Sequence, residues 1–290
     1  MSIALTIAVC SNRPATLPGA VDRILPLLDP EDWLLVVLDH PGSGPAAEVI
    51  GAAAQDGRVR LLHNGANLGL SASRNRALKE APTRCLLFLD DDISPNTEAL
   101  RAVRAALANG KHVVGTRITA DLQGQQPPWF LSPGQLHYLG CHHPARPASI
   151  WGGCFGLDIA HARMLGVAFD ERLGRVGASL ASAEDTTFVR TLTDRGATAA
   201  VLYDTAVTHL IPAHRLRLHY LLRRAYWQGR SEVRRGNTRS GLRKEWQRNR
   251  PHHPARQPRQ TALALFYTAA VTVGAVRELL VRRPVLEAKP

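Results

Sequence analysis

The stretch "CLLFLDDDISPNT" (residues 85–97) decides how the chain folds, because an apolar run of five residues ends in three consecutive aspartates. Such a continuous apolar run is typical of a strand that is covered on both faces of a parallel sheet. Asn96 then provides a helix start, and Asn109-Gly110 provides its end. The stretch therefore predicts a buried strand, a turn that carries Asp90–Asp92, and a helix over 96–110.

The same alternation extends through the first 120 residues. Apolar strand-like runs lie at residues 2–10, 32–40, 58–64 and 111–118, and helix-like stretches lie at residues 15–28, 44–55, 69–81 and 96–110. This order predicts an α/β domain in which parallel strands alternate with helices. In such open sheets, ligands bind at the carboxyl ends of the strands, where "CSNRP", "LDHPGSG", "HNGANLG" and "DDDISP" fall.

The remainder of the chain divides into three segments. Residues 1–211 form the main domain, with halves 1–120 and 121–211; 124–147 is loop-like, and strands are expected at 197–204 and 206–211. A basic helical pattern at 214–235 and an Arg/Pro/His-rich linker occupy 212–259, and an apolar helix ends the chain at 260–290.

Charge is concentrated in one segment. The net charge is +12, and residues 212–259 alone contain fourteen Lys/Arg and two Glu. A nucleic-acid-binding protein could use this segment, but it has few aromatics and no recognised module. Attraction to an anionic lipid surface, a lipid-linked acceptor or a donor diphosphate explains it equally well, and we expect no nucleic-acid partner.

The composition also indicates the compartment. The 45% hydrophobic content excludes disordered and fibrous classes, and the four cysteines lack C-x-x-C spacing, so reduced thiols in the cytoplasm are expected. A zinc cluster at Cys141, His142, His143 and Cys154 has no recognised ligand spacing. The N-terminus lacks a basic region and a cleavage site, and it reads as a first strand.

The C-terminal segment has two interpretations. Residues 261–276 are sixteen uncharged residues, fewer than the ~20 that span a bilayer. They predict either a helix that packs on the main domain, or an interfacial helix that docks beside the basic segment on an anionic membrane at the inner face of the plasma membrane.

Three adjacent carboxylates repel each other unless cations or donors neutralise them. Asp90 and Asp92 are two residues apart, and hard oxygen ligands on a turn suit Mg²⁺ or Mn²⁺ bound together with a phosphate. The alternative is an acidic turn in which Asp92 or Ser94 caps the next helix.

Several motifs resemble family 2 glycosyltransferases, in order and with appropriate spacing. These are "TIAVCSNRPATL" (6–17), "LLVVLDHPGSG" (34–44), "HNGANLGLSASRNRAL" (63–78), "LLFLDDDISP" (86–95) and "GVAFDERLG" (166–174) with "SAEDTTFVRTLTDRGA" (182–197). The resemblance covers about residues 3–230. It implies a GT-A fold, with a Rossmann-like nucleotide-binding half and a mixed sheet, followed here by a C-terminal helical extension.

The resemblance also implies the reaction: inverting transfer of one sugar from a nucleoside-diphosphate-sugar, such as a UDP-sugar, with Mg²⁺ or Mn²⁺. The Q-x-x-R-W signature of processive members is missing. Donor-binding residues carried over by the resemblance are Ser11, Arg13, Asp39, Asn67, Ser71, Arg74, Asp90 and Asp91. The implied metal ligands are Asp92, Asp90 and His209.

Asp185 is the candidate general base; alternatively, its carboxylate serves the helix N-terminus. Glu184, Trp151 and Gly153 are the acceptor-side candidates, although Trp151 suits a core equally well. The acceptor is expected to be a saccharide, a lipid-linked molecule or a natural product.

Two departures from the family pattern leave base recognition open: His40 replaces the second Asp after the second strand, and Cys10-Ser11 replace Pro-Thr. A non-catalytic glycosyltransferase-like protein is a further alternative. A sugar nucleotidyltransferase is disfavoured, because no Gly-rich loop follows the first strand.

Overall fold

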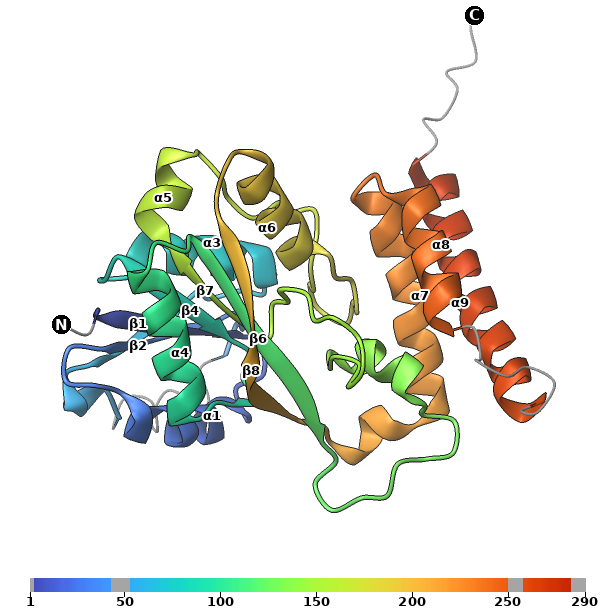
Figure 1. Ribbon diagram of the computed structural model, residues 1–290, viewed down its shortest axis with the longest axis horizontal. Coiled ribbons are helices and arrows are strands. Elements are labelled where there is room, and N and C mark those ends of the chain that lie inside the picture. Colours follow the sequence, from blue (N-terminus) through green and yellow to red (C-terminus); the bar gives the residue numbers. More distant parts are fainter. Residues whose placement is uncertain (1–2, 43–52, 250–257, 283–290) are drawn as a thin grey trace, which may run out of the picture.

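An eight-stranded mixed sheet organises the computed structural model, which describes residues 3–42, 53–249 and 258–282 (Figure 1). The strands are β1 (Leu5–Ser11), β2 (Trp33–Leu38), β3 (Val59–His63), β4 (Cys85–Leu89), β5 (Ile93–Ser94), β6 (Val113–Asp121), β7 (Cys154–Asp158) and β8 (Ala199–Leu210). Their order is β3-β2-β1-β4-β7-β6-β8-β5. The first four in this order run parallel, and β7 pairs antiparallel with both β4 and β6. The expected α/β class with a mixed sheet is confirmed.

Helices cover both faces of this sheet. The helices of the α/β part are α1 (Leu17–Ile24), α3 (Leu70–Glu80), α4 (Thr97–Ala108), α5 (Ile159–Met164) and α6 (Glu184–Asp194), with short 3-10 helices η1 (Leu25–Leu27), η2 (Ala54–Asp56), η3 (Pro133–Leu139) and η4 (Ala213–Leu216). The helix expected at 44–55 lies mostly outside the described residues.

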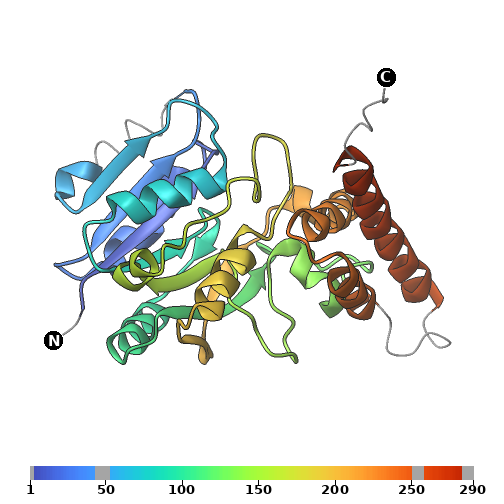
Figure 2. The same cartoon turned by 90° about the horizontal axis from the view of Figure 1, so that it is seen from above.

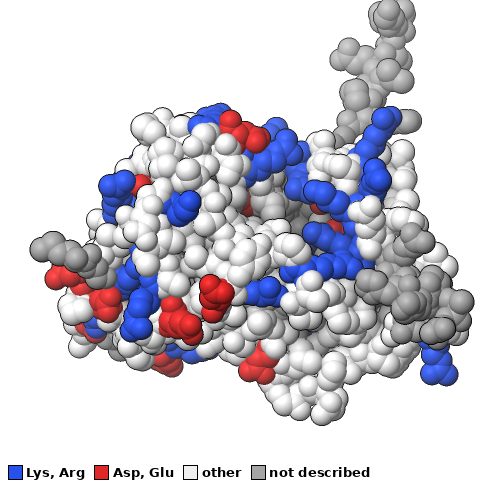
Figure 3. Space-filling view, in the orientation of Figure 1, with Lys and Arg blue, Asp and Glu red and all other residues white. Residues whose placement is uncertain are grey.

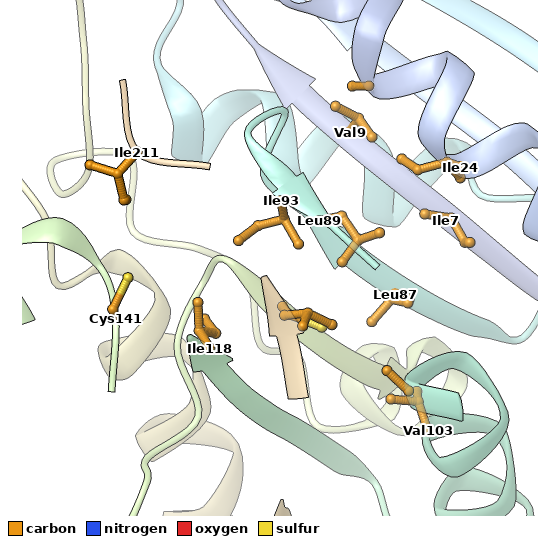
Figure 4. Close-up of a cluster of buried hydrophobic side chains, with 14 of the residues drawn as sticks. Ile7, Val9, Ile24, Leu87, Leu89, Ile93, Val103, Ile118, Cys141 and Ile211 are labelled. Carbon is orange, nitrogen blue, oxygen red and sulfur yellow. The ribbon is translucent and has the colours of Figure 1, made fainter. Parts of the chain in front are cut away.

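Alternate residues of each central strand enter opposite cores. Ile7 and Val9 pack with α1 and α4, as Figure 4 shows, whereas Ala8 and Cys10 pack with α3, α5 and α6. Burying one such side chain contributes about 1.5–3 kcal/mol for the larger aliphatic residues. Burial on both sides is the physical reason that these strands are apolar throughout.

β8 is one strand where the sequence suggests two. Its register against β6 jumps from Leu202 to Ala206, so the strand bulges between the two predicted segments. Beyond the bulge, His209 pairs with Ile93 of β5. The bulged strand thus carries His209 to the turn that contains the three aspartates.

The C-terminal part is a group of three helices, α7 (Leu218–Arg234), α8 (Thr238–Asn249) and α9 (Pro258–Arg282), beside the α/β part (Figures 1 and 2). Part of the predicted Arg/Pro/His-rich linker is helical, because residues 238–249 form α8. Glu245 on α8 accepts hydrogen bonds from His137 and Tyr138 of η3. These polar contacts hold α8 in place, which explains why an apolar pattern does not mark it.

α9 packs on α7 through two glycines. A Cβ at Gly229 would lie 1.8 Å from Val271 O, and one at Gly274 would lie 1.9 Å from Tyr226 O. Glu278 adds ion pairs to Arg230 and Arg234 at 2.8 and 2.9 Å. Tyr267 also stacks on Tyr138 of the main domain, with ring centroids 5.4 Å apart, so the inner face of α9 packs as the first interpretation expects.

The outer face of α9 is apolar and exposed. Its large exposed side chains are Leu265, Phe266, Val273, Val276, Leu279, Leu280 and Val281. Pro258–Val281 is long and apolar enough to cross a membrane by length and composition, and one third of its most apolar window (33%) is buried inside the molecule.

Candidate active site

A cleft of about 230 Å³ opens where the sheet meets the C-terminal helices. The strand-end loops after β1, β2 and β4, the start of α6 and the helices α7 and α8 line it. Figure 3 shows Lys and Arg side chains gathered around a hollow between these two parts of the molecule. The cleft thus contains residues of three of the four strand-end segments that the sequence pointed to, and none of residues 63–69 lines it.

Asp91 is an internal anchor. Its side chain is 3% exposed, and it accepts hydrogen bonds from Ser11 Oγ at 2.5 Å, from Thr16 Oγ1 and from the Arg13 guanidinium. Ser11 Oγ in turn accepts from the backbone N–H of Arg13 at 2.9 Å. Asp91, Ser11 and Arg13 therefore lie together, and Asp91 fixes the loop after β1.

Asp92 faces His209. The distance from Asp92 Oδ1 to His209 Nε2 is 3.1 Å, and Asp92 Oδ2 lies 2.9 Å from both Arg215 and Arg13. Burial raises the pKa of Asp92, but the hydrogen bond from His209 and the charges of Arg215 and Arg13 outweigh it and hold the pKa well below its usual value. Asp92 is therefore a carboxylate at neutral pH.

The spacing of this pair is that of two ligands of an octahedral cation, but the Arg215 guanidinium lies 2.9 Å from Asp92 Oδ2 and 3.2 Å from His209 Nε2, so it would have to move for a cation to bind. Adjacent ligands at the usual ~2.1 Å lie about 3 Å apart, close to the separation of Asp92 Oδ1 and His209 Nε2. The Asp90 carboxylate pairs with Arg74 at 3.2 Å. Within the described residues, no three His, Cys, Asp or Glu side chains are grouped to hold a metal, so the predicted three-residue ligand set is not assembled.

Arg74 connects the two sides of the cleft. It is 2% exposed and donates to Asp90 Oδ1 at 3.2 Å, to Glu184 Oε1 at 3.0 Å and to Gly152 O at 3.1 Å. A Cβ at Gly152 would lie 2.6 Å from Arg74 Nη2, so this approach requires glycine. Burial and the charge of Asp185 raise the pKa of Glu184 to about 7, although Arg74 lowers it. Glu184 Oε2 is buried without a hydrogen-bond partner.

Asp185 lies at the start of α6 and lines the cleft. Its Oδ2 accepts from Gly152 N–H at 2.5 Å and its Oδ1 from Thr186 N–H at 2.6 Å. Each carboxylate oxygen has further lone pairs, so the group can still accept a proton. These contacts are those of the helix N-terminus interpretation, and they also fix the orientation of the Asp185 carboxylate at the cleft.

Trp151 and Gly153 also line the cleft. The Trp151 ring stacks on His142 at 4.0 Å, and burial lowers the pKa of His142 to about 4. A Cβ at Gly153 would lie 3.0 Å from Ile118 Cδ1. Trp151 therefore forms an aromatic surface at the wall of the cleft, and the stacked His142 ring holds it in place.

Three residues expected to bind the sugar donor form hydrogen bonds with loop backbone. Asp39 lines the cleft, but its carboxylate accepts from the backbone N–H groups of Leu68 and Gly69, each at 2.8 Å. Asn67 and Ser71 lie outside the lining: Ser71 Oγ donates to Leu173 O at 2.8 Å, and Asn67 Oδ1 accepts from Gly177 N at 3.4 Å. The structure thus gives Asn67 and Ser71 contacts that fix the loop before α6.

Sequence reasoning missed several cleft residues. Gly152 and five arginines line the cleft without having been singled out: Arg175, Arg215, Arg224, Arg235 and Arg248. Four of the arginines belong to the basic segment. The local excess of positive charge marks this segment in the sequence. Nothing in the residue pattern distinguishes the arginines that face the cleft from those that face solvent.

All four cysteines are buried and free, in agreement with reduced thiols. Burial raises the pKa of Cys10, Cys141 and Cys154 to about 12, so these thiols stay protonated. Cys141 Sγ lies 3.8 Å from His209 Nδ1, where it supports the imidazole.

The sequence matches a known family, and the fold is similar to solved structures. The sequence profile described as "Glycosyl transferase family 2" matches residues 6–154, which is more than half of the chain. Among solved structures, the mannosyltransferase PcManGT from Pyrobaculum calidifontis in complex with GDP-Man and Mn²⁺ matches with a TM-score of 0.63 and 15% identity, covering 98% of this chain and 89% of that one.

A second similar structure is residues 1–349 of S. aureus TarS in complex with UDP-GlcNAc, with a TM-score of 0.58 and 16% identity, covering 93% of this chain and 82% of that one. A search of curated proteins found no match. These likenesses confirm the expected GT-A fold.

Proposed function

The chain belongs to glycosyl transferase family 2 and is a glycosyltransferase, and from that premise we propose that it transfers one sugar, with inversion, from a nucleoside-diphosphate-sugar to an acceptor hydroxyl. The observation that carries the proposal is the convergence of Asp92, His209 and Asp185 on one cleft. Donors of this class are bound by the two solved relatives, as GDP-Man and UDP-GlcNAc.

The donor half is built from strand ends. Asp39 and Asp90 are proposed to face the nucleoside, and Arg13 with Arg215 to face the diphosphate. These two guanidiniums are held by Asp92 at 2.9 Å. Because the departing nucleoside diphosphate gains negative charge, fixed positive groups beside it lower the barrier.

Asp92 and His209 are proposed to hold Mg²⁺ or Mn²⁺, which when bound would neutralise the diphosphate as a Lewis acid. Their separation of 3.1 Å supports this assignment, and Mg²⁺ commonly takes few protein ligands and completes its shell with phosphate and water.

Asp185 is proposed as the general base. The acceptor oxygen attacks the anomeric carbon on the face opposite the diphosphate, the bond to the phosphate oxygen breaks, and the hydroxyl proton passes to the Asp185 carboxylate. The hydrogen bonds from Gly152 and Thr186 support the role, because they fix the carboxylate at the cleft. Trp151 and Gly153 are proposed to line the acceptor path.

A panel of nucleotide sugars, including GDP-Man and UDP-GlcNAc, tests the function through protection from thermal unfolding with and without Mn²⁺ or Mg²⁺. At least one donor should raise the melting temperature in a cation-dependent manner. Asp185→Asn should keep this donor protection and lose transfer, whereas Asp22→Asn, an exposed control on α1, should behave as the wild type. The proposal fails if no nucleotide sugar shifts the melting temperature with either cation.

We further propose that the outer face of α9 contacts an anionic membrane surface from the cytoplasmic side. The exposed apolar residues Leu265, Phe266 and Val273 lie on α9, and the packed neighbour α8 exposes Arg239, Arg243 and Lys244. Apolar burial combined with positive charge is the usual combination for interfacial helices.

Vesicle flotation tests this contact. The full chain should float with phosphatidylglycerol vesicles and not with phosphatidylcholine vesicles, and replacing Leu265, Phe266 and Val273 by Ser should abolish flotation. If the wild type stays unbound and is instead a dimer that the same variant converts to monomer, the face is an interface between copies and the membrane assignment is wrong.

A further inference from the structure

Arg224 is a buried cation in the wall of the cleft. It lies on α7, its side chain is 6% exposed, and it lines the cleft. Its Nε donates to Tyr138 O at 3.2 Å and its Nη1 to Leu180 O. Both partners are neutral carbonyls, so these bonds orient the guanidinium without balancing its charge.

Arg175 lies near it in the loop before α6 and also lines the cleft. Its backbone carbonyl accepts from Leu70 N–H at 2.9 Å, which fixes the loop. Its guanidinium forms no hydrogen bond or ion pair within the part of the chain that the structure describes. The charge of Arg175 is near enough to act on Arg224: burial first, and then this charge, lower the pKa of Arg224 to about 10.

The other arginines that line the cleft all have carboxylate partners. Arg13 and Arg215 pair with Asp92, Arg74 with Asp90 and Glu184, Arg235 with Glu232, and Arg248 with Glu245. Among the described residues, no carboxylate lies within ion-pair distance of Arg224 or Arg175. The cleft therefore has two guanidiniums outside any ion pair, and Glu184 acts electrostatically on both of them from beyond that distance.

Arg224 is a buried charge outside any ion pair, which is unfavourable, and a ligand that supplies the opposite charge recovers this energy. Arg175 is half-buried and adds its charge at the wall of the cleft. Arginine suits phosphate and carboxylate groups, which accept two parallel N–H···O bonds. The two guanidiniums thus predict an anionic group in the ligand.

The position of the two residues indicates which ligand carries that group. Arg175 precedes Glu184 and Asp185 in one segment, and Arg224 binds Leu180 O of the same segment. The proposed diphosphate site has its own guanidiniums, Arg13 and Arg215, beside Asp92. Arg175 also acts electrostatically on Asp90, and Arg215 acts on Arg224. Glu184, the neighbour of the proposed base, is the group that interacts with both Arg175 and Arg224, so their charges lie at the half of the cleft that contains this base.

We infer that Arg224 and Arg175 form an anion subsite for the acceptor, so that the acceptor is an acidic molecule carrying a phosphate or carboxylate group close to its reacting hydroxyl. This inference rests on the proposed function, because it assigns the donor diphosphate to the Asp92 side of the cleft.

Isothermal titration of the full chain with inorganic phosphate tests the subsite, first alone and then with the nucleotide that gives the largest thermal shift. Phosphate should bind in both states. Arg175→Gln should raise its Kd about tenfold, and Arg224→Gln should raise it further. Arg175→Gln removes no side-chain bond that the structure contains, so it keeps the test valid if Arg224→Gln does not fold.

Arg223→Gln is the matched control. Arg223 neighbours Arg224 on α7 and donates to Ala178 O of the same loop at 2.7 Å, but it does not line the cleft. Arg223→Gln should leave the phosphate Kd unchanged. This result would show that the effects of the other two variants do not come from the loss of one positive charge or from a loosened loop.

Unchanged phosphate binding in both Arg175→Gln and Arg224→Gln would falsify the inference. A different result would overturn the acceptor assignment: added nucleotide abolishes phosphate binding, and Arg175→Gln binds nucleotide more weakly. The two arginines would then belong to the site of the donor diphosphate. The thermal shift with nucleotide sugar is recorded on the same samples. A positive shift without phosphate binding rejects the subsite alone, whereas the absence of any shift rejects the proposed function.

Discussion

Arg74 on α3 donates a hydrogen bond to Glu184 on α6 over 3.0 Å, although 110 residues separate them in the chain. The same guanidinium contacts Asp90, the first of the three strand-end aspartates. One buried arginine thus fixes the distance between a carboxylate on the proposed donor side and the residue that precedes the proposed base.

Arg74→Lys should weaken both folding and catalysis. A lysine ammonium cannot span Asp90, Glu184 and the Gly152 carbonyl, so at least one buried carboxylate loses its partner. We expect the free energy of unfolding to fall by about 3 kcal/mol and kcat to fall more than donor affinity. Urea denaturation and steady-state kinetics measure both, with Arg76→Lys, on the same helix but outside the cleft, as control. Wild-type values in Arg74→Lys would contradict this role.

Glu184 should make stability depend on pH. Its pKa in the folded protein is about 7, raised from 4.5 by burial and by Asp185, so the folded state binds this proton more tightly than the unfolded chain. The contribution is complete below pH 4.5 and is lost as the pH rises through 7.

Glu184→Gln should remove this dependence, so that the variant gains stability relative to the wild type by roughly 3 kcal/mol between pH 4.5 and 8. Urea denaturation at a series of pH values provides the measurement, and the exposed Glu31→Gln is the control. Parallel curves for the wild type and Glu184→Gln would show that Glu184 is not the titrating group.

The sequence predicts the α/β part well because its strands are buried on both faces, which leaves a continuous apolar signature in residues 34–38 and 85–89. The strand-end positions of Asp90–Asp92 follow from that signature. The proximity of Asp92 and His209 does not, since it depends on the bulge in β8; the family resemblance alone pointed to it.

The sequence fails where polar contacts decide the structure. α8 has no apolar stripe, and it docks through Glu245 and Asn249, which reach Tyr138 and its neighbours. Arg224 lies in a basic segment, and such a segment is usually expected to be exposed to solvent. Its side chain is buried because it donates hydrogen bonds to the backbone carbonyls of Tyr138 and Leu180. Every residue has a backbone carbonyl, so the sequence does not show which carbonyl accepts a hydrogen bond.

Asp91 and Asp92 should be separable by mutation. Asp91→Asn removes a buried carboxylate that accepts from Ser11, Thr16 and Arg13, so it should lower the free energy of unfolding by about 2 kcal/mol while cation-dependent donor protection persists. Asp92→Asn should instead lose that protection.

The comparison is made by thermal unfolding with a donor, with and without Mn²⁺, and a chelator should bring the wild type to the level of Asp92→Asn. If Asp91→Asn loses cation dependence and Asp92→Asn keeps it, the roles of the two aspartates are exchanged.

The contact between α7 and α9 should not tolerate a methyl group. A Cβ at Gly274 would meet Tyr226 O at 1.9 Å, and this atom belongs to the backbone of a helix and cannot turn aside. Gly274→Ala would stabilise an isolated helix by about 1 kcal/mol, so any loss of stability must come from the contact between the helices. We expect the free energy of unfolding to fall by about 1–3 kcal/mol, as in overpacked cores, and α9 to become sensitive to limited proteolysis. Thr272→Ala, at an exposed position of the same helix, should change neither quantity, and a stabilised Gly274→Ala would mean that α9 does not pack on α7 in solution.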